Sequence, residues 1–149
     1  MDDPYAFQLD PQLEKDTVPI ADWHLCQVRL MNDSRYPWVI LIPKVPDIAE
    51  IHELAEEQQH LLLGESVRLS KALDKLFAPR KLNVAALGNM VRQLHIHHIV
   101  RFEDDASFPK PIWGVGEAVP YDSDALHETV NGLMTVSYTH LTLPTMRTV

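Results

Sequence analysis

This chain carries the sequence Gln-Leu-His-Ile-His-His-Ile-Val-Arg from Gln93 to Arg101. Successive side chains of a β-strand point to opposite faces, so Gln93, His95 and His97 would share one face, with apolar residues behind them. An imidazole can act as a nucleophile, as an acid or base, or as a metal ligand near neutral pH. We therefore expect the chemistry of the protein to centre on this strand.

The composition is that of a globular protein with one ordinary domain. The chain has 149 residues, of which 46% are hydrophobic, and its formal net charge is −8. This length suffices for a real hydrophobic core. The negative charge argues against binding to nucleic acid, although a local group of N–H donors could still hold a phosphate-bearing small molecule. No stretch approaches the roughly 20 apolar residues that span a bilayer, so no membrane partner is expected.

The cysteine content and the first residues bear on location. The single cysteine, Cys26, can form no internal disulfide, which suits a reducing compartment. The acidic segment from Met1 to Pro4 lacks the apolar run of a signal peptide. We therefore expect a cytoplasmic protein.

Hydrophobic periodicity and turn residues predict both strands and helices. Strands are expected at residues 25–31, 38–42, 82–87 and 91–102. Helices are expected at residues 11–15, 47–51, 54–76 and 123–133. The apolar run from Trp38 to Ile42 is typical of a buried central strand. Asp47 is the expected N-cap of the second helix, with Glu50 completing a capping box.

The end of the chain departs from this pattern. The threonine-rich segment from Val136 to Thr145 resembles a peptide translated from sequencing-adaptor DNA joined to a truncated gene. We expect residues 1–134 to form one domain, and residues 135–149 to be a non-native or disordered tail. His140, which lies in this tail, is given no role.

The histidine stretch resembles the motif of the histidine-triad (HIT) superfamily, His-φ-His-φ-His-φ-φ, in which φ is an apolar residue. Three further segments are similar to a bacterial HIT branch with a Gln-x-His-x-His motif: residues 30–43, 82–89 and 108–114. A long helix follows the first of them, as in that branch. The resemblance extends from about Asp16 to about Leu133. A lone His-x-His would be weak evidence, but the ordered set is specific.

This resemblance implies an α+β fold, with an antiparallel sheet of about five strands, one long helix and short flanking helices. It also implies a homodimer that hydrolyses or transfers nucleotides at an α-phosphorus, without a cofactor. Dinucleoside polyphosphates or nucleoside phosphoramidates are the implied substrates. The partner is thus expected to be a small nucleotide.

The resemblance also implies roles for single residues. His95 stands at the middle position of the motif and would be the nucleophile, forming a nucleotidyl-imidazole that water cleaves. His97 would lie against the phosphate and help to neutralise it. Asn32 would bind ribose, although as a residue of an Asn-Asp-Ser turn it has an equally good structural explanation. Gly88 and Asn89 would donate to phosphate oxygens.

The sequence departs from the family motif at its first position, where Gln93 replaces histidine. An amide cannot become cationic or shuttle a proton, but it can donate to a phosphate oxygen or orient its neighbour. Arg92 stands where a proline is expected. His98 replaces an aliphatic residue and is expected in the core, at a rim or at an interface.

Three other interpretations stay open at this point. The histidines could be structural residues of a half-buried strand. The protein could be a nucleotide-binding module without useful turnover, with Gln93 marking lost acid–base capacity. His95 and His97 could also chelate a metal, although no third ligand occurs at a recognisable spacing.

Overall fold

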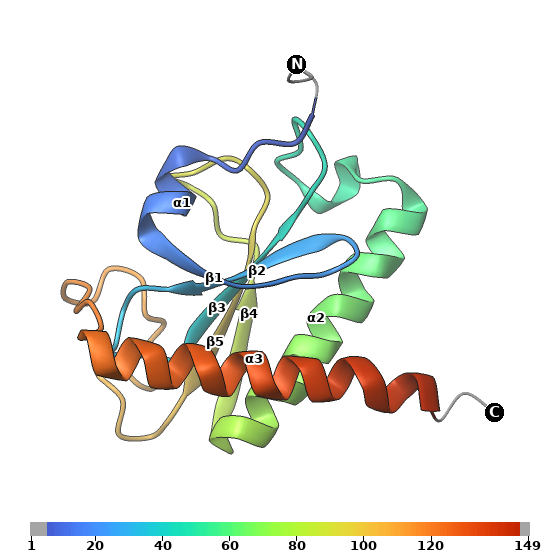
Figure 1. Cartoon of the computed structure of the whole chain (residues 1–149). Coiled ribbons are helices and arrows are strands. Elements are labelled where there is room, and N and C mark those ends of the chain that lie inside the picture. Colours follow the sequence, from blue (N-terminus) through green and yellow to red (C-terminus); the bar gives the residue numbers. More distant parts are fainter. Residues whose placement is uncertain (1–5, 147–149) are drawn as a thin grey trace.

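Five antiparallel strands form one sheet, in the order β1-β2-β3-β5-β4 (Figure 1). The computed structural model describes the backbone of residues 6–146 and the side chains of residues 6–137. The strands are β1 (Thr17–Asp22), β2 (Cys26–Met31), β3 (Trp38–Pro43), β4 (Lys81–Ala85) and β5 (Ile96–Arg101).

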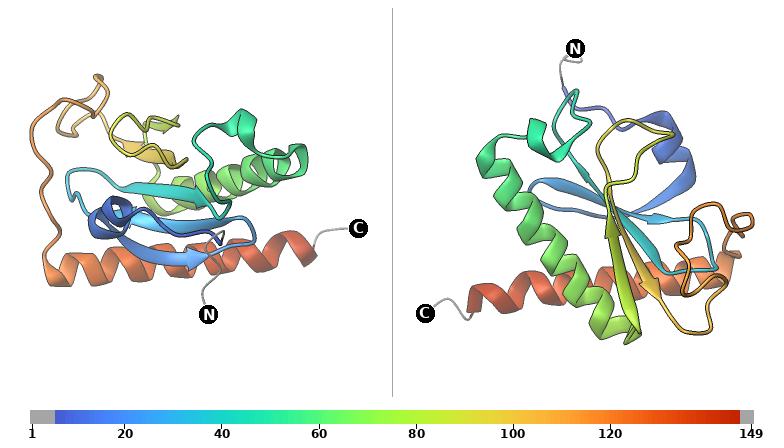
Figure 2. Two further views of the ribbon diagram at one scale, coloured as in Figure 1. Left: turned by 90° about the horizontal axis from the view of Figure 1, so that it is seen from above. Right: turned by 180° about the vertical axis from the view of Figure 1, so that it is seen from behind.

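The helices divide between the two faces of this sheet. They are α1 (Pro11–Asp16), the short 3-10 helix η1 (Ile51–Glu53), α2 (Glu56–Phe77) and α3 (Ser123–Met146). The two long helices α2 and α3 cross each other on one side of the molecule (Figure 2). This arrangement confirms the expected α+β fold with one sheet and a long central helix.

The main core lies between the sheet and the two long helices. Leu69 and Leu73 of α2 and Leu133 of α3 are at most 2% exposed there, against buried residues from β2, β3 and β5. Each such side chain contributes roughly 1.5–3 kcal/mol relative to an exposed position. A smaller core forms on the opposite face, where Leu13 of α1 packs with Ile40 and Ile42 of β3. Both faces of β3 are therefore buried, as its apolar run predicted.

A buried carboxylate joins α2 to the turn between β1 and β2. Glu65 is 5% exposed and accepts the backbone N–H groups of Leu25 and Cys26, each at 2.9 Å. Burial, together with the charge of Glu65, raises the pKa of the Cys26 thiol well above its ordinary value. Cys26 is therefore a protonated thiol near neutral pH, and we give it no chemical role.

The structure corrects several of the expected element boundaries. β1 was not predicted, and β5 begins at Ile96 rather than at residue 91. The helical turn lies at Ile51–Glu53 rather than at residues 47–51, because Asp47 has a φ of 57° that a helix N-cap does not adopt. At the start of this turn, the carboxylate of Glu53 accepts the backbone N–H groups of Ala49 and Glu50, and Asp47 does not act as the cap.

The last helix is longer than the sequence predicted. α3 continues from Ser123 to Met146, through the segment expected to break the helical pattern. No glycine or proline occurs between Leu133 and Leu143, so nothing there interrupts the backbone hydrogen bonds. The side chain of His140 and residues 147–149 lie outside the described part of the chain. Within that part, no helix is both long and apolar enough to cross a membrane.

Candidate active site

His95 lies directly before β5, and a nearby backbone carbonyl determines which ring nitrogen carries the proton. The side chain is 5% exposed, and Nδ1 lies 2.6 Å from the carbonyl oxygen of Gln93. A carbonyl can only accept a hydrogen bond, so Nδ1 carries the proton and donates. The lone pair of the neutral ring is therefore on Nε2. This is the tautomer in which Nε2 can act as a nucleophile.

His97, in β5, has a hydrogen bond at each ring nitrogen. Its Nε2–H donates to the carbonyl oxygen of Leu87 at 2.7 Å, and its Nδ1 accepts from the indole N–H of Trp38 at 3.0 Å. Burial lowers the pKa of His97 to about 4, and the Leu87 carbonyl only partly opposes this shift. The ring is thus neutral at physiological pH. To neutralise a phosphate it would have to exchange one of these bonds, so that role stays a prediction.

The two imidazoles lie side by side in an aromatic cluster. The ring centroids of His95 and His97 are 4.8 Å apart in an edge-to-face arrangement, as expected for residues that share a face. The indoles of Trp113 and Trp38 lie 5.3 Å and 5.6 Å from the His97 ring. The sequence placed Trp38 in the apolar run of a buried strand and did not predict a bond to the motif. The pairing of β3 with β5 places Ile40 opposite His97. Trp38 lies two residues before Ile40 on the same face of β3, so its indole can reach the His97 ring.

The loop from Ala86 to Gln93 brings the backbone close to His95. A Cβ added at Gly88 would lie 2.7 Å from the carbonyl oxygen of Val91 and 3.3 Å from Cε1 of His95. Residue 88 must therefore be glycine for this close approach. The same loop supplies the carbonyl of Leu87 to His97.

A polar cavity of about 190 Å³ opens beside His95. Gly88 and Asn89, both expected to bind phosphate, line it together with His95, Gln93 and Arg92. The structure therefore brings four of the six expected site residues together around one space, whereas His97 and Asn32 do not line it.

Gln93 contacts a segment that the sequence did not connect with the motif. Its side-chain Oε1 accepts the backbone N–H of Asp10 at 2.8 Å, and its Nε2 donates to the carbonyl oxygen of Gln8 at 2.9 Å. These bonds reach more than 80 residues back along the chain. The expected contact of Gln93 with a phosphate oxygen stays a prediction.

Asn32 is not among the residues that line the cavity beside His95. It follows β2, and its Oδ1 accepts the backbone N–H of Tyr121 at 2.9 Å. Its neighbour Asp33 is 1% exposed; burial would raise its pKa, but hydrogen bonds from Arg35 and Val119 outweigh burial and lower it. This turn thus fixes the segment that precedes α3, in line with the structural explanation of Asn32. Its ribose contact stays a prediction.

The remaining motif histidine faces the opposite side of the sheet. His98 is 0% exposed, and its Nε2 lies 2.7 Å from Oγ of Ser66 in α2. Burial lowers its pKa to about 4, although hydrogen bonds at Ile96 and Val39 oppose the shift. His98 is therefore a core residue. Among the described residues, no group of three or more His, Cys, Asp or Glu side chains is placed to hold a metal ion.

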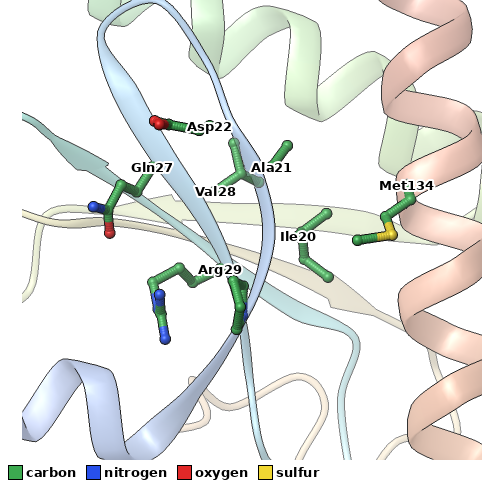
Figure 3. A pocket seen from close by; sticks show the side chains of 8 residues that line it. Ile20, Ala21, Asp22, Gln27, Val28, Arg29 and Met134 are labelled. Carbon is green, nitrogen blue, oxygen red and sulfur yellow. The ribbon is translucent and has the colours of Figure 1, made fainter.

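A larger hollow of about 380 Å³ lies elsewhere, along β1 and β2 near α3 (Figure 3). Ile20 of β1 and Met134 of α3 face each other across it. None of the residues expected in the site lines this hollow. We therefore place the candidate active site at His95.

Comparisons with known proteins agree with this fold and motif. The HIT domain family model matches residues 12–104. A histidine triad protein from Marinobacter aquaeolei is 47% identical, with a TM-score of 0.87 over 90% of this chain and 98% of its own. One from Sinorhizobium meliloti is 43% identical, with a TM-score of 0.84 over 87% of this chain and 96% of its own. One from Bradyrhizobium japonicum is 41% identical, with a TM-score of 0.85 over 87% and 97%. No match was found among curated proteins.

The chain therefore belongs to the histidine-triad (HIT) family, as the motif around His95 implied. Proteins of this family are generally nucleotide-binding hydrolases or transferases, and some of them are not catalytic.

Proposed function

We propose that this protein hydrolyses or transfers a nucleotidyl group at an α-phosphorus, with His95 as a covalent nucleophile. The bond from its Nδ1–H to the Gln93 carbonyl carries the proposal, because it leaves the Nε2 lone pair for attack. An N–P bond forms as the bond from phosphorus to the leaving group breaks. The leaving group takes that electron pair. The ring becomes cationic, and the same carbonyl stabilises it through the Nδ1–H.

In the second step, water or another acceptor attacks the phosphorus. The N–P bond breaks, its electron pair returns to Nε2, and the neutral imidazole is restored. An attacking water gives its proton to solvent, and the product is a nucleoside monophosphate. Two easier displacements thus replace one difficult displacement, because the imidazole of the intermediate is a good leaving group.

The surroundings of His95 favour a leaving group that needs no proton. Gln93 is an amide and cannot act as an acid, and His97 is neutral because its pKa is lowered to about 4. A phosphate leaving group departs as an anion near neutral pH, whereas an amine must be protonated as it leaves. We therefore place dinucleoside polyphosphates ahead of nucleoside phosphoramidates as substrates.

The cavity beside His95 offers donors for such a polyphosphate. We propose that the backbone of Gly88, the amide of Asn89 and the guanidinium of Arg92 contact its oxygens, since all three line the cavity. Asn32 would donate its side-chain N–H to ribose, because its Oδ1 is already bonded to Tyr121. Fixed donors around the phosphorus are the largest expected contribution to the rate.

Trapping the intermediate tests the mechanism and separates it from a nucleotide-binding module without turnover. A dinucleoside polyphosphate with a labelled α-phosphorus is mixed with protein, and the denatured protein is washed at alkaline pH. Label should stay on the protein and be released by acid, as an N–P bond requires. His95→Asn should abolish labelling, whereas His60→Asn, at an exposed position on α2, should not. Nucleotide that binds tightly without any covalent label would favour the binding module.

Turnover measurements complement trapping. His95→Asn should reduce turnover by several orders of magnitude, as the loss of a covalent step does. His97→Ala should reduce it by roughly 10²–10³ at most. If His97→Ala were the more damaging change, the two roles would be reversed.

We also propose that two copies pair through β4 and α2. β4 is a terminal strand of the sheet, and its Val84 is 51% exposed. Leu63 and Val67, one turn apart on α2, are 65% and 44% exposed. Apolar residues exposed beside a sheet edge are typical of an interface. Sedimentation should give a dimer for the natural chain and a monomer for Leu63→Glu combined with Val84→Lys; an unchanged dimer would place the interface elsewhere.

We further infer a cytoplasmic location. The chain has a single cysteine and can form no internal disulfide, which suits a reducing compartment.

A further inference from the structure

Gln93 holds two parts of the molecule that are distant in the sequence. Its side-chain amide is bonded to the backbone of Gln8 and Asp10, at 2.9 Å and 2.8 Å. Its backbone carbonyl accepts the Nδ1–H of His95 at 2.6 Å. One residue therefore links the N-terminal segment to the ring that we propose as the nucleophile.

The N-terminal segment from Phe7 to Asp10 is itself anchored. Phe7 and Leu9 pack against the smaller core of Leu13, Ile40 and Ile42. The polar backbone groups of this segment are thus presented to Gln93 from a fixed position. Val91, two residues before Gln93, packs against the same core.

We propose that Gln93 is a positioning residue, which clamps the segment from Phe7 to Asp10 onto the loop that carries His95. This inference rests on the proposed role of His95 as the nucleophile. With the amide held, the Gln93 carbonyl stays where it orients the imidazole. When the clamp is lost, the carbonyl and the ring shift together, and attack on phosphorus becomes slower.

The chemistry of the clamp explains why an amide stands at this position. The bridge needs one acceptor for the N–H of Asp10 and one donor for the carbonyl of Gln8. A carboxamide carries both on the same carbon, so both reach one short backbone segment. The two nitrogens of an imidazole point to different sides of the ring, and a histidine at residue 93 could keep only one of these bonds. The amide also holds the bridge at any pH, because it does not titrate.

The clamp can be broken from its other end with a matched pair of variants. Asp10 has a φ of −56°, which proline also adopts, so Asp10→Pro removes the N–H that Gln93 accepts without straining φ. Asp10→Ala keeps this N–H. Both variants lose the carboxylate that accepts the N–H of Gln12 at the start of α1. The difference between them therefore isolates the bond to Gln93.

The decisive experiment is a double-mutant cycle of Gln93→Leu in these two backgrounds. In Asp10→Ala, Gln93→Leu should lower kcat roughly 10-fold with little change in KM, because the nucleophile is misplaced rather than the substrate lost. In Asp10→Pro, where the clamp is already weakened, the same change should lower kcat less than about 3-fold. Equal losses in both backgrounds would show that Gln93 acts on the substrate directly, and would overturn the clamp.

Hydrogen exchange tests the clamp without any turnover. In Gln93→Leu, the backbone N–H of Asp10 should exchange at least about tenfold faster. The N–H of Leu94, which donates to the carbonyl of Ile48, should be unchanged. Unchanged exchange at Asp10, or faster exchange at both amides, would overturn the proposal. Because this measurement needs no substrate, it still decides the question if the proposed enzymatic activity is absent.

Discussion

The indole N–H of Trp38 is bonded to Nδ1 of His97, at 3.0 Å across the neighbouring strands β3 and β5. This bond requires His97 to be deprotonated at Nδ1, because an N–H cannot donate to a second N–H. Trp38 therefore stabilises the neutral form of the imidazole, in addition to packing beside it.

Replacing Trp38 by Phe should raise the pKa of His97 from its value of about 4. The phenyl ring retains apolar contact but removes the donor that favours the neutral ring. Proton NMR titration of the His97 ring measures the shift directly. A pKa that stays the same or falls would show that burial alone sets the charge of this ring.

The free energy of unfolding should fall as the pH drops from about 6.5 to about 4. Burial lowers the pKa values of both His97 and His98 from 6.5 to about 4, so between these limits the unfolded chain binds more protons than the folded one. Each group should then contribute a slope of up to about 1.4 kcal/mol per pH unit. The stability is fully present above pH 6.5 and is lost as the pH falls towards 4. Urea unfolding at intervals across this range gives the slope.

The carboxylate of Asp105 acts in a lower pH range and serves as an internal control. The pKa of Asp105 is lowered to about 2, because its hydrogen bonds with Arg101 and with the backbone outweigh burial. Its contribution is present above its ordinary pKa of 3.8 and is lost only below that value. Constant stability between pH 6.5 and 4 would therefore contradict the assignment to the histidines.

Glu65→Gln should destabilise the fold by about 1–3 kcal/mol, the scale of a buried group left unpaired. The two carboxylate oxygens accept the N–H groups of Leu25 and Cys26, and an amide would place its own NH₂ against one of them. Glu57→Gln, at an exposed position on the same helix, should be nearly neutral. Urea midpoints of the two variants provide the comparison. Equal stabilities would mean that the Glu65 bonds make no net contribution.

Deleting residues 135–149 should shift the thermal midpoint by no more than a few degrees, or about 1 kcal/mol for a chain of this size. Among the residues whose side chains the structure describes, Leu133 is the last one of α3 in the main core. Ser137 is also buried, at 3% exposure, so a second chain truncated after Ser137 is the matched control. A large loss only in the shorter chain would move the domain boundary to Ser137. A large loss in both would show that the tail is an integral part of the fold.

The elements with strong local patterns could be predicted from the sequence. The apolar run from Trp38 to Ile42 predicted β3, and the hydrophobic periodicity of residues 54–76 predicted α2 to within two residues. β1 was missed because it contains Pro19 and a bulge, and it is defined by pairing with β2 rather than by its own alternation. The motif also predicted the candidate site at His95. The partners of its residues did not follow, because Gln8, Leu87 and Trp38 reach the motif only through tertiary contacts.

The two neighbouring imidazoles of the site depend on the fold to different degrees. His95 is oriented by a carbonyl two residues away in the same short stretch of chain, whereas His97 needs Trp38 and Leu87 from two other segments. If β3 or the loop that carries Leu87 separated from β5, His97 would lose the bonds that set its tautomer, whereas His95 could keep its bond to the Gln93 carbonyl. The bond that sets the tautomer of His95 is therefore local in the sequence, whereas the bonds that hold His97 neutral exist only in the assembled sheet.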